Sequence, residues 1–423
     1  MKKLVTALGA AVLLHAVAAL SQQATASAEI PAEEWERFKA EFAAMADRLS
    51  ALEAENARLR ATAASAIPVE DLNAEVALVK EQNRKSSWTE TVRWKGDFRY
   101  RVEEIDRQGE NSRERNRIRA RAALIATPSP TIEVGLGMAS GGDNPVSTNQ
   151  TLGGGGSSKE LRLDLAYVTW SGLENTAVSA GKFSNPFYRA GGSQLIWDSD
   201  FRPEGFAAGW RHERLFATAA YSFLESDSNA GDDVFWGVQV GATLPVLDNL
   251  SLTAAAKYLE IPSKGRFAFD ADDPDFFGNS FVLVNGDPLY AVDYDLFNAS
   301  LELSYSIFDW PVSTFADFVR NTAADELDTG YILGFSIGEG SVPGHWDFSY
   351  QYQDLEADGA FGLINDSNFA DGSTDGKGHR LAARYHIRKS WYVAATWFDN
   401  QVGVDLGDDV GYKRLVLDTS FKY

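Results

Sequence analysis

Apolar residues recur at every second position from Trp88 to the end of the chain, and this period constrains the fold more than any other feature. In one run Phe98, Tyr100 and Val102 alternate with charged residues, and the last run ends with Phe421 and Tyr423. Successive side chains of a β-strand point to opposite faces, so each run predicts a strand with one apolar and one polar face. Such strands build barrels that have lipid outside and water inside. A soluble β-sandwich also alternates, but its strands are usually shorter.

The breaks between these runs alternate between short and long. The short breaks lie near residues 127–130, 172–175, 212–214, 247–249, 309–311, 338–344 and 388–390. The long breaks lie near residues 106–112, 142–158, 185–204, 226–232, 261–291, 321–328, 356–377 and 401–409. Short turns at one rim and long loops at the other are typical of outer-membrane barrels. We therefore predict an all-β transmembrane antiparallel barrel of about 16 strands over residues 88–423, with an even strand number that returns both ends to the periplasmic side.

The N-terminus predicts export. Lys2 and Lys3 precede the apolar stretch Leu4–Leu20, and Ala26–Ala28 supplies the small residues of a cleavage site, so residues 1–28 read as a signal peptide. A transmembrane anchor is the alternative, but the stretch is short and no basic cluster follows it. No later stretch is apolar and long enough to cross a bilayer as a helix, so a membrane role must use strands.

Residues 29–87 follow a heptad pattern instead. Apolar residues alternate three and four positions apart, with one amide among them, at Trp35, Phe38, Phe42, Met45, Leu49, Leu52, Asn56 and Leu59. This pattern predicts a periplasmic α-helical coiled coil that joins copies of the chain, in which Asn56 would fix the register. Pro68 interrupts the pattern, and a single amphipathic helix packed on the barrel is the alternative.

Composition and motifs exclude several classes of function. The 60 acidic residues exceed the 39 basic ones, which argues against nucleic acid as a partner. There is no cysteine, so no disulfide supports the fold. We find no nucleophile motif, zinc motif or phosphate-binding loop, and the five histidines are scattered. We therefore expect no enzyme, no cofactor and no metal site.

An arginine ladder is the sharpest local signal. The members of this ladder lie two positions apart on one strand, at Arg113, Arg115, Arg117, Arg119 and Arg121. Exposure of these side chains to lipid would cost about 2–4 kcal/mol each near the bilayer midplane, so we expect the ladder to face the lumen. Lys95, Arg99 and Arg101 extend the predicted basic wall on the preceding strand. The alternative is that the arginines serve only to solvate the lumen or to pair with carboxylates such as Glu103 and Asp164.

The long break at residues 185–204 is a candidate constriction loop. Gly191 and Gly192 permit a sharp turn, and the charged members are Arg189, Asp198, Asp200, Arg202 and Glu204. We expect this loop to bend into the lumen and to place Asp198, Asp200 and Glu204 opposite the basic wall, although a position on the outer surface is the alternative. Other acidic loops could bind calcium or bridge lipopolysaccharide, but a solvated surface is the simpler interpretation.

The sequences of these segments resemble those of the putative porin family of Gram-negative bacteria, whose members carry an N-terminal coiled coil. The matching stretches are Phe98–Val102, Arg113–Arg121, Asn144–Leu152, Leu163–Val168, Gly181–Phe187, Trp197–Asp200, Pro203–Gly205, Lys377–His379 and Arg414–Asp418. Tyr423 departs from the pattern, because many barrels end in phenylalanine. The resemblance implies a general diffusion pore in the outer membrane that is a homotrimer.

We therefore expect passive diffusion of small hydrophilic solutes and ions, with outer-membrane lipid and lipopolysaccharide as the surroundings. Two alternatives stay open. A substrate-specific anion or phosphate channel would use the same arginines, and a structural tether to the cell wall would use the coiled coil.

Overall fold

The computed structural model describes residues 32–66, 76, 91–225, 233–268, 275–407 and 409–423. Residues 1–87 and residues 88–423 form two separate units. The predicted signal peptide, Pro68 and most of residues 69–87 lie outside the described residues.

The first unit contains one long helix, α2 (Ala32–Ala66), of 35 residues. Its sequence is rich in alanine, glutamate and arginine and contains neither glycine nor proline, which suits a helix interior. Met45, Leu49, Leu52 and Leu59 are each between 56% and 66% exposed, so the single chain leaves this part of the heptad stripe uncovered. Within the described part of the chain, no helix combines the length and the apolar character needed to cross a bilayer.

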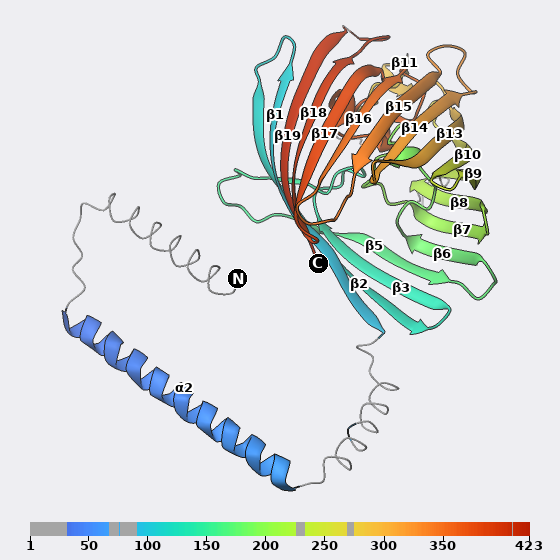
Figure 1. Ribbon diagram of the computed structural model, residues 1–423. Coiled ribbons are helices and arrows are strands. Elements are labelled where there is room, and N and C mark those ends of the chain that lie inside the picture. The colour runs from blue at the N-terminus through green and yellow to red at the C-terminus, as the bar shows by residue number, and fades with distance from the viewer. Residues whose placement is uncertain (1–31, 67–75, 77–90, 226–232, 269–274, 408) are drawn as a thin grey trace. The chain divides into compact units, whose positions relative to one another are not determined.

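The second unit is a closed antiparallel barrel of 16 strands (Figure 1), which confirms the predicted fold class of the residues after 88. The strands are β1 (Val92–Arg107), β2 (Arg113–Ser129), β3 (Ile132–Ser140), β5 (Leu161–Trp170), β6 (Thr176–Lys182), β7 (Glu204–His212), β8 (Leu215–Glu225), β9 (Asp233–Leu247), β10 (Leu250–Ile261), β13 (Tyr294–Ile307), β14 (Trp310–Asn321), β15 (Thr329–Gly338), β16 (Trp346–Leu355), β17 (Gly376–Arg388), β18 (Trp391–Val402) and β19 (Val410–Lys422). Each strand pairs with its sequence neighbours, and β1 pairs with β19 to close the ring.

The last residue helps to close this ring. The Gly96 and Tyr423 backbones exchange two hydrogen bonds, of 2.9 and 3.1 Å, and the Tyr423 hydroxyl donates to the Arg121 carbonyl at 3.0 Å. A Cβ atom at position 96 would lie 2.6 Å from a ring carbon of Tyr423, so glycine is needed where the terminal ring crosses the strand.

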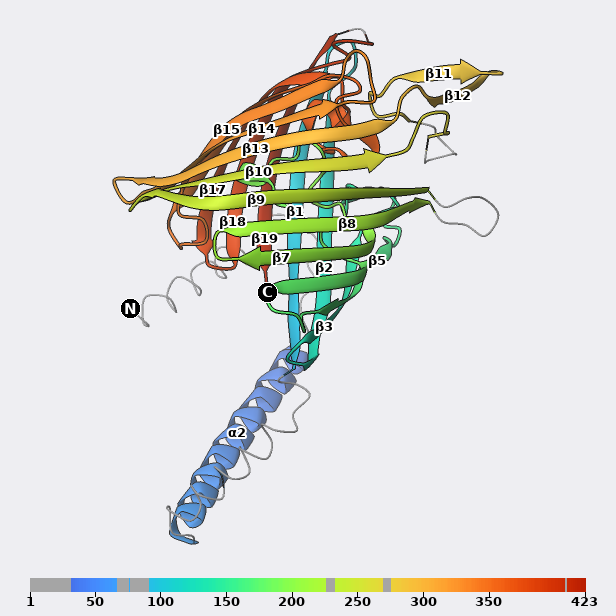
Figure 2. The ribbon, with the colours of Figure 1, turned by 90° about the vertical axis from the view of Figure 1, so that its right-hand side faces the viewer.

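The longest connections and the tightest turns lie at opposite rims, as predicted. The β3–β5, β6–β7, β10–β13 and β16–β17 connections are long, and five of the links at the other rim are two-residue turns. The β1–β2 link is no longer than the β5–β6 link, however, and the β15–β16 link is as long as the β14–β15 link. One long segment contains the two-residue strand β4 (Gln150–Thr151), which pairs with β2. Another forms the hairpin β11 (Phe281–Val284) and β12 (Asp287–Tyr290), which extends away from the barrel in Figure 2.

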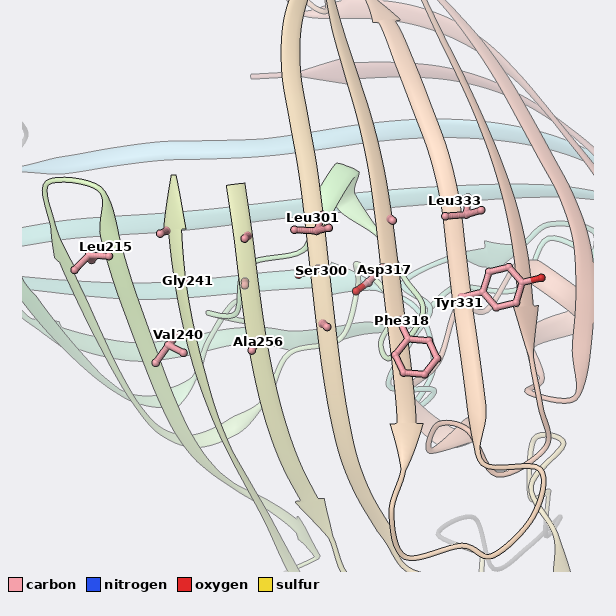
Figure 3. Close-up of a pocket in the computed structure, with 15 residues that line it drawn as sticks. Leu215, Val240, Gly241, Ala256, Ser300, Leu301, Asp317, Phe318, Tyr331 and Leu333 are labelled. Atoms are coloured by element: carbon pink, nitrogen blue, oxygen red, sulfur yellow. The ribbon is translucent and has the colours of Figure 1, made fainter. Parts of the chain in front are cut away.

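The outer face is apolar. Val240, Leu301 and Leu333 are more than half exposed, whereas their strand neighbours Gln239 and Ile332 are buried on the lumenal side. A hollow of about 810 Å³ lies on this outer face across β8–β10 and β13–β15 (Figure 3), and alanines form much of its lining. Val240, Leu301 and Leu333 belong to its lining, together with the buried residues Ser300 and Asp317.

Tryptophans mark the rim of the short turns. Four exposed indole rings lie at strand ends next to these turns, at Trp170, Trp210, Trp310 and Trp346, and the exposed Trp94 lies near the start of β1. Aromatic girdles of this kind occur where a barrel meets the membrane–water interface.

Candidate functional site in the barrel lumen

The arginine ladder of β2 faces charged residues of β1 row by row. The register places Asp97 opposite Arg121 and Glu103 opposite Arg115. The two rows between them place arginine against arginine, as Arg99 with Arg119 and Arg101 with Arg117. Strand β19 closes the other side of β1, where Asp418 lies opposite Arg101 and Arg414 lies opposite Ile105.

Ion pairs hold most of these side chains. Asp97 pairs with Arg121 at 2.5 Å and with Arg119 at 3.0 Å. Glu103 is fully buried and pairs with Arg115 at 2.8 Å, with Arg117 at 3.4 Å and with Arg414.

Asp418 completes the wall from β19. Its two carboxylate oxygens accept hydrogen bonds from Arg101, both at 2.8 Å, and it lies 3.9 Å from Arg99. With Asp200 included, seven arginines therefore share four carboxylates, and we refer to this set as the arginine wall: Arg99, Arg101, Arg115, Arg117, Arg119, Arg121 and Arg414 with Asp97, Glu103, Asp200 and Asp418. The wall keeps a positive excess.

Two members of the predicted basic set lie apart from this wall. Lys95 and Arg113 are exposed near opposite ends of the β1–β2 pair, and neither makes an ion pair with another described residue. The structure thus brings six of the eight predicted basic residues together and leaves these two aside.

The segment between β6 and β7, residues 183–203, reaches across to distant strands, and we call it the first lumenal loop. The Tyr188 hydroxyl donates to Glu302 of β13 at 2.6 Å, and the Tyr188 backbone N–H donates to Gln239 of β9 at 2.7 Å. Trp197 lies under the ammonium of Lys257 of β10, which is 4.4 Å from the ring centroid. These contacts place the segment inside the ring of strands.

A short 3₁₀ turn, η2 (Ala190–Gly192), bends this loop. Gly191 adopts a φ of 57°, and its N–H donates to Glu302 at 2.9 Å. A side chain at this position would clash with the Phe315 ring, so the left-handed conformation and the close approach both require glycine.

The five predicted charged members of the loop have different partners. Asp200 contacts the arginine wall, at 3.0 Å from Arg121 and 3.6 Å from Arg119. Arg202 lies 3.7 Å from Asp164, and Glu204 is the first residue of β7 and pairs with Lys182 at 2.5 Å. The predicted acidic rim is therefore not one surface, because only Asp200 of its three acids faces the arginines.

The other two members, Arg189 and Asp198, are held inside the loop packing. Burial lowers the pKa of Arg189, against the effect of the nearby Asp198. The Asp198 carboxylate accepts hydrogen bonds from the Ser367 backbone at 2.9 Å and hydroxyl at 2.8 Å. Burial, and after it the neighbouring Asp366 and Asp200, raises the pKa of Asp198 to about 7. Burial alone would raise the pKa of Asp200 too, but Arg119 and Arg121 hold it below its usual range.

A second lumenal loop, residues 356–375 between β16 and β17, packs against the first. It contains the short turns η3 (Gly362–Ile364) and η4 (Phe369–Gly372). The Asn365 amide donates to the Leu195 carbonyl at 2.9 Å, and the Gln194 amide donates to Asp366 at 3.2 Å. Asn368 accepts a hydrogen bond of 3.3 Å from Arg101, so this loop also reaches the arginine wall.

Apolar side chains of both loops fill one side of the lumen. Leu195, Trp197, Phe361 and Ile364 belong to a buried cluster whose strand members come from β7–β10 and β13–β16. The arginine wall lies on β1, β2 and β19, which contribute no residue to this cluster. A second, smaller buried cluster packs Phe369 of the second loop against Ile105 of β1 and Val416 of β19, next to one end of the wall.

A comparison with known protein families identifies the family of this chain. Residues 106–263 and 279–411 match the family described as putative porin. The chain belongs to this porin family. Among curated proteins, none matches this porin.

Solved structures of bacterial outer-membrane proteins are similar to this chain at low sequence identity, and OprB shares its fold. OprB of Pseudomonas putida in its high-pH structure is 11% identical, with 81% of this chain and 97% of that chain covered and a TM-score of 0.55. OmpF of Salmonella typhi in complex with daunomycin is 11% identical, with 79% and 99% covered and a TM-score of 0.47. OmpT of Vibrio cholerae in a trimer form is 13% identical, with 79% and 99% covered and a TM-score of 0.44. Family and fold together establish an outer-membrane channel and point away from an enzyme.

Several residues of this site carry no recognisable sequence signal. The second lumenal loop reads as an acidic surface loop, although Asp366 and Asp375 are buried. Asp366 accepts a hydrogen bond from the Asn368 backbone within the loop, and Asp375 accepts one from the Asp405 backbone of the β18–β19 connection. The aromatic residues Phe361 and Phe369 among these acids were the available clue, because a solvated loop has no need of them. Among the described residues, no three histidine or acidic side chains are arranged to hold a metal ion.

Proposed function

We propose that this porin passes small hydrophilic solutes and inorganic ions passively, and that the arginine wall gives it a preference for anions. The observation that carries the proposal is the excess of seven arginines over four carboxylates on one wall of the lumen. Fixed charge on a pore wall attracts the opposite ion and repels the like one.

The packing of the two lumenal loops indicates where solutes would pass through the barrel. The apolar cluster fills the side of the lumen formed by β7–β10 and β13–β16, and water does not enter such packing. Solutes would therefore pass between the two lumenal loops and the arginine wall. Asp200 of the first lumenal loop and Asn368 of the second are bonded to arginines of this wall, so these contacts would define the narrowest part.

A bilayer recording tests the proposal. In a KCl gradient we expect the reversal potential of the wild type to indicate anion preference, and we expect the triple variant Arg115→Ala/Arg117→Ala/Arg119→Ala to shift it toward cations. The matched control is Arg214→Ala/Arg388→Ala/Lys389→Ala, which removes three positive charges from exposed residues at two short turns, away from the arginine wall. An equal permeability ratio in wild type and ladder variant would refute the role of the wall.

We further propose a homotrimer joined by a periplasmic coiled coil that includes α2. The exposed residues Met45, Leu49, Leu52 and Leu59 support this, because an uncovered apolar stripe on a long helix is the usual surface of a coiled coil. The exposed apolar belt supports outer-membrane lipid and lipopolysaccharide as the surroundings of the barrel. A purely structural tether would show no conductance after reconstitution, so the same recording separates it from a channel.

A further inference from the structure

We propose that the arginine wall contains a defined binding site for a small oxyanion, formed by Arg99, Arg101 and Arg117 with the loop amides Asn149 and Asn368. The ligand would carry at least two acceptor oxygens, as a phosphate or sulfate ion does. This inference rests on the proposed anion-conducting function and adds a saturable site to it.

The two middle rows of the wall concentrate positive charge. Arg99 faces Arg119 and Arg101 faces Arg117 directly across the β1–β2 pair. Like charges placed directly opposite each other on a sheet repel, so these rows need an anion nearby. Each end row of the wall contains one acidic residue, Asp97 opposite Arg121 and Glu103 opposite Arg115. These two carboxylates form ion pairs with the arginines of their own rows.

The four arginines of the middle rows differ in how closely a carboxylate approaches them. Asp418 directs both oxygens to Arg101, and its distance of 3.9 Å from Arg99 is too long for a hydrogen bond. Arg119 forms ion pairs with both Asp97 and Asp200. Arg99 and Arg117 are thus the least neutralised arginines of the four.

The same two arginines have unused donors. The Nε–H groups of Arg99 and Arg117 are buried and have no hydrogen-bond partner among the described residues, as is also true of Arg115 and Arg414. Their side chains keep 11% and 15% of their surface exposed, against 2% for Arg414, so a small ion could contact them from the lumen. A guanidinium can offer two parallel N–H groups to one oxyanion, and the ion would approach the exposed part of each side chain.

Two loop amides orient the arginines without neutralising them. Asn149 accepts a hydrogen bond from Arg99 at 2.6 Å, and Asn368 accepts one from Arg101 at 3.3 Å. They come from two different connections, β3–β5 and β16–β17. A carboxylate at either position would cancel the charge, as Asp200 does beside Arg119 and Arg121. Neutral carbonyls hold the guanidinium groups in place and preserve their attraction for an anion.

The test is a titration of inorganic phosphate during single-channel recording of the full porin in KCl. We expect phosphate to reduce the chloride current along a saturating curve, and sulfate to do the same. In Arg99→Lys, which keeps the formal charge but loses the paired donors, the half-blocking concentration should rise roughly tenfold. Arg388→Lys, at an exposed turn, is the matched control and should behave as the wild type.

The outcomes separate this site from the proposed function. A block that does not saturate, or one that is identical in wild type and Arg99→Lys, overturns the site, while anion preference in the KCl gradient would still support the channel function. A reversal potential without anion preference overturns both. The heat-dependent gel mobility of each variant shows that the barrel has folded, and Asn149→Ala/Asn368→Ala provides a second variant that should weaken the block with no change in formal charge.

Discussion

The Tyr188 hydroxyl donates a hydrogen bond of 2.6 Å to Glu302, which joins the β6–β7 connection to β13, the fourth strand beyond β7 around the ring. The same carboxylate accepts hydrogen bonds from the Gly191 backbone at 2.9 Å and from the Ser313 hydroxyl at 2.7 Å. One charged group therefore anchors the first lumenal loop at its far end.

Removal of this anchor should widen the channel. In Glu302→Ala the loop loses two hydrogen bonds to a charged acceptor, each worth about 1.5–3 kcal/mol, so we expect a larger and noisier single-channel conductance. Tyr188→Phe removes only one of these bonds and should give a smaller change in the same direction. Unchanged conductance in both variants would mean that the loop is held in place by its apolar packing alone.

Glu103 should stabilise the barrel and limit its charge. Its buried carboxylate pairs with Arg115, Arg117 and Arg414, and the loss of one member of such a buried set typically costs about 3–5 kcal/mol. We therefore expect Glu103→Gln to lower the temperature of heat-dependent gel mobility change and to move the reversal potential further toward anions. Glu104→Gln, an exposed neighbour on the opposite face of β1, is the control and should leave both unchanged.

Docking of the first lumenal loop should depend on pH through Asp198. The ordinary pKa of an aspartic acid is 3.8, and burial beside Asp366 raises the pKa of Asp198 to about 7. The docked loop therefore keeps a proton that an undocked loop loses, so the contribution to docking is complete below about pH 4 and is lost as the pH rises to about 7. Brief openings in single-channel records should become more frequent from pH 5 to pH 7 and then level off. Asp198→Asn should remove this trend, and Asp409→Asn, an exposed acid in another connection, should preserve it.

The barrel was predictable because its determinants are local. Alternation places each side chain on a face, and turn residues mark the ends of strands, so sequence alone gave sixteen strands and the order of short and long connections. The strand number was predicted to be even because both ends of the barrel were expected at the same rim.

The partners in the lumen depend on register and loop packing, which sequence patterns do not specify. Asp418 meets Arg101 across 317 positions only because β19 pairs with β1 in one register. The ladder itself was predicted from its spacing. The sequence did not predict that Asp198 and Glu204 lie away from the wall. The direction of a side chain in an irregular loop depends on tertiary contacts, such as the hydrogen bonds from Ser367 to Asp198.

The helix α2 should determine the oligomeric state. Leu49→Ser/Leu52→Ser removes two exposed leucines of the heptad stripe, and each leucine buried in a coiled coil contributes about 1.5–3 kcal/mol. We expect this variant to shift from trimer to monomer in chemical cross-linking and in mass measurements in detergent, at unchanged conductance per barrel. Ala51→Ser/Ala54→Ser is the matched control, because both alanines are exposed on the same helix but lie outside the stripe.

These measurements also separate the coiled coil from its alternative. If α2 instead packed on the barrel of its own chain, the leucine variant would keep the mass of the wild type, and its barrel would lose stability because the loss of apolar burial would fall within one chain. A trimer that survives in the leucine variant would place the subunit contact on the barrels, where the exposed apolar outer face is the available surface.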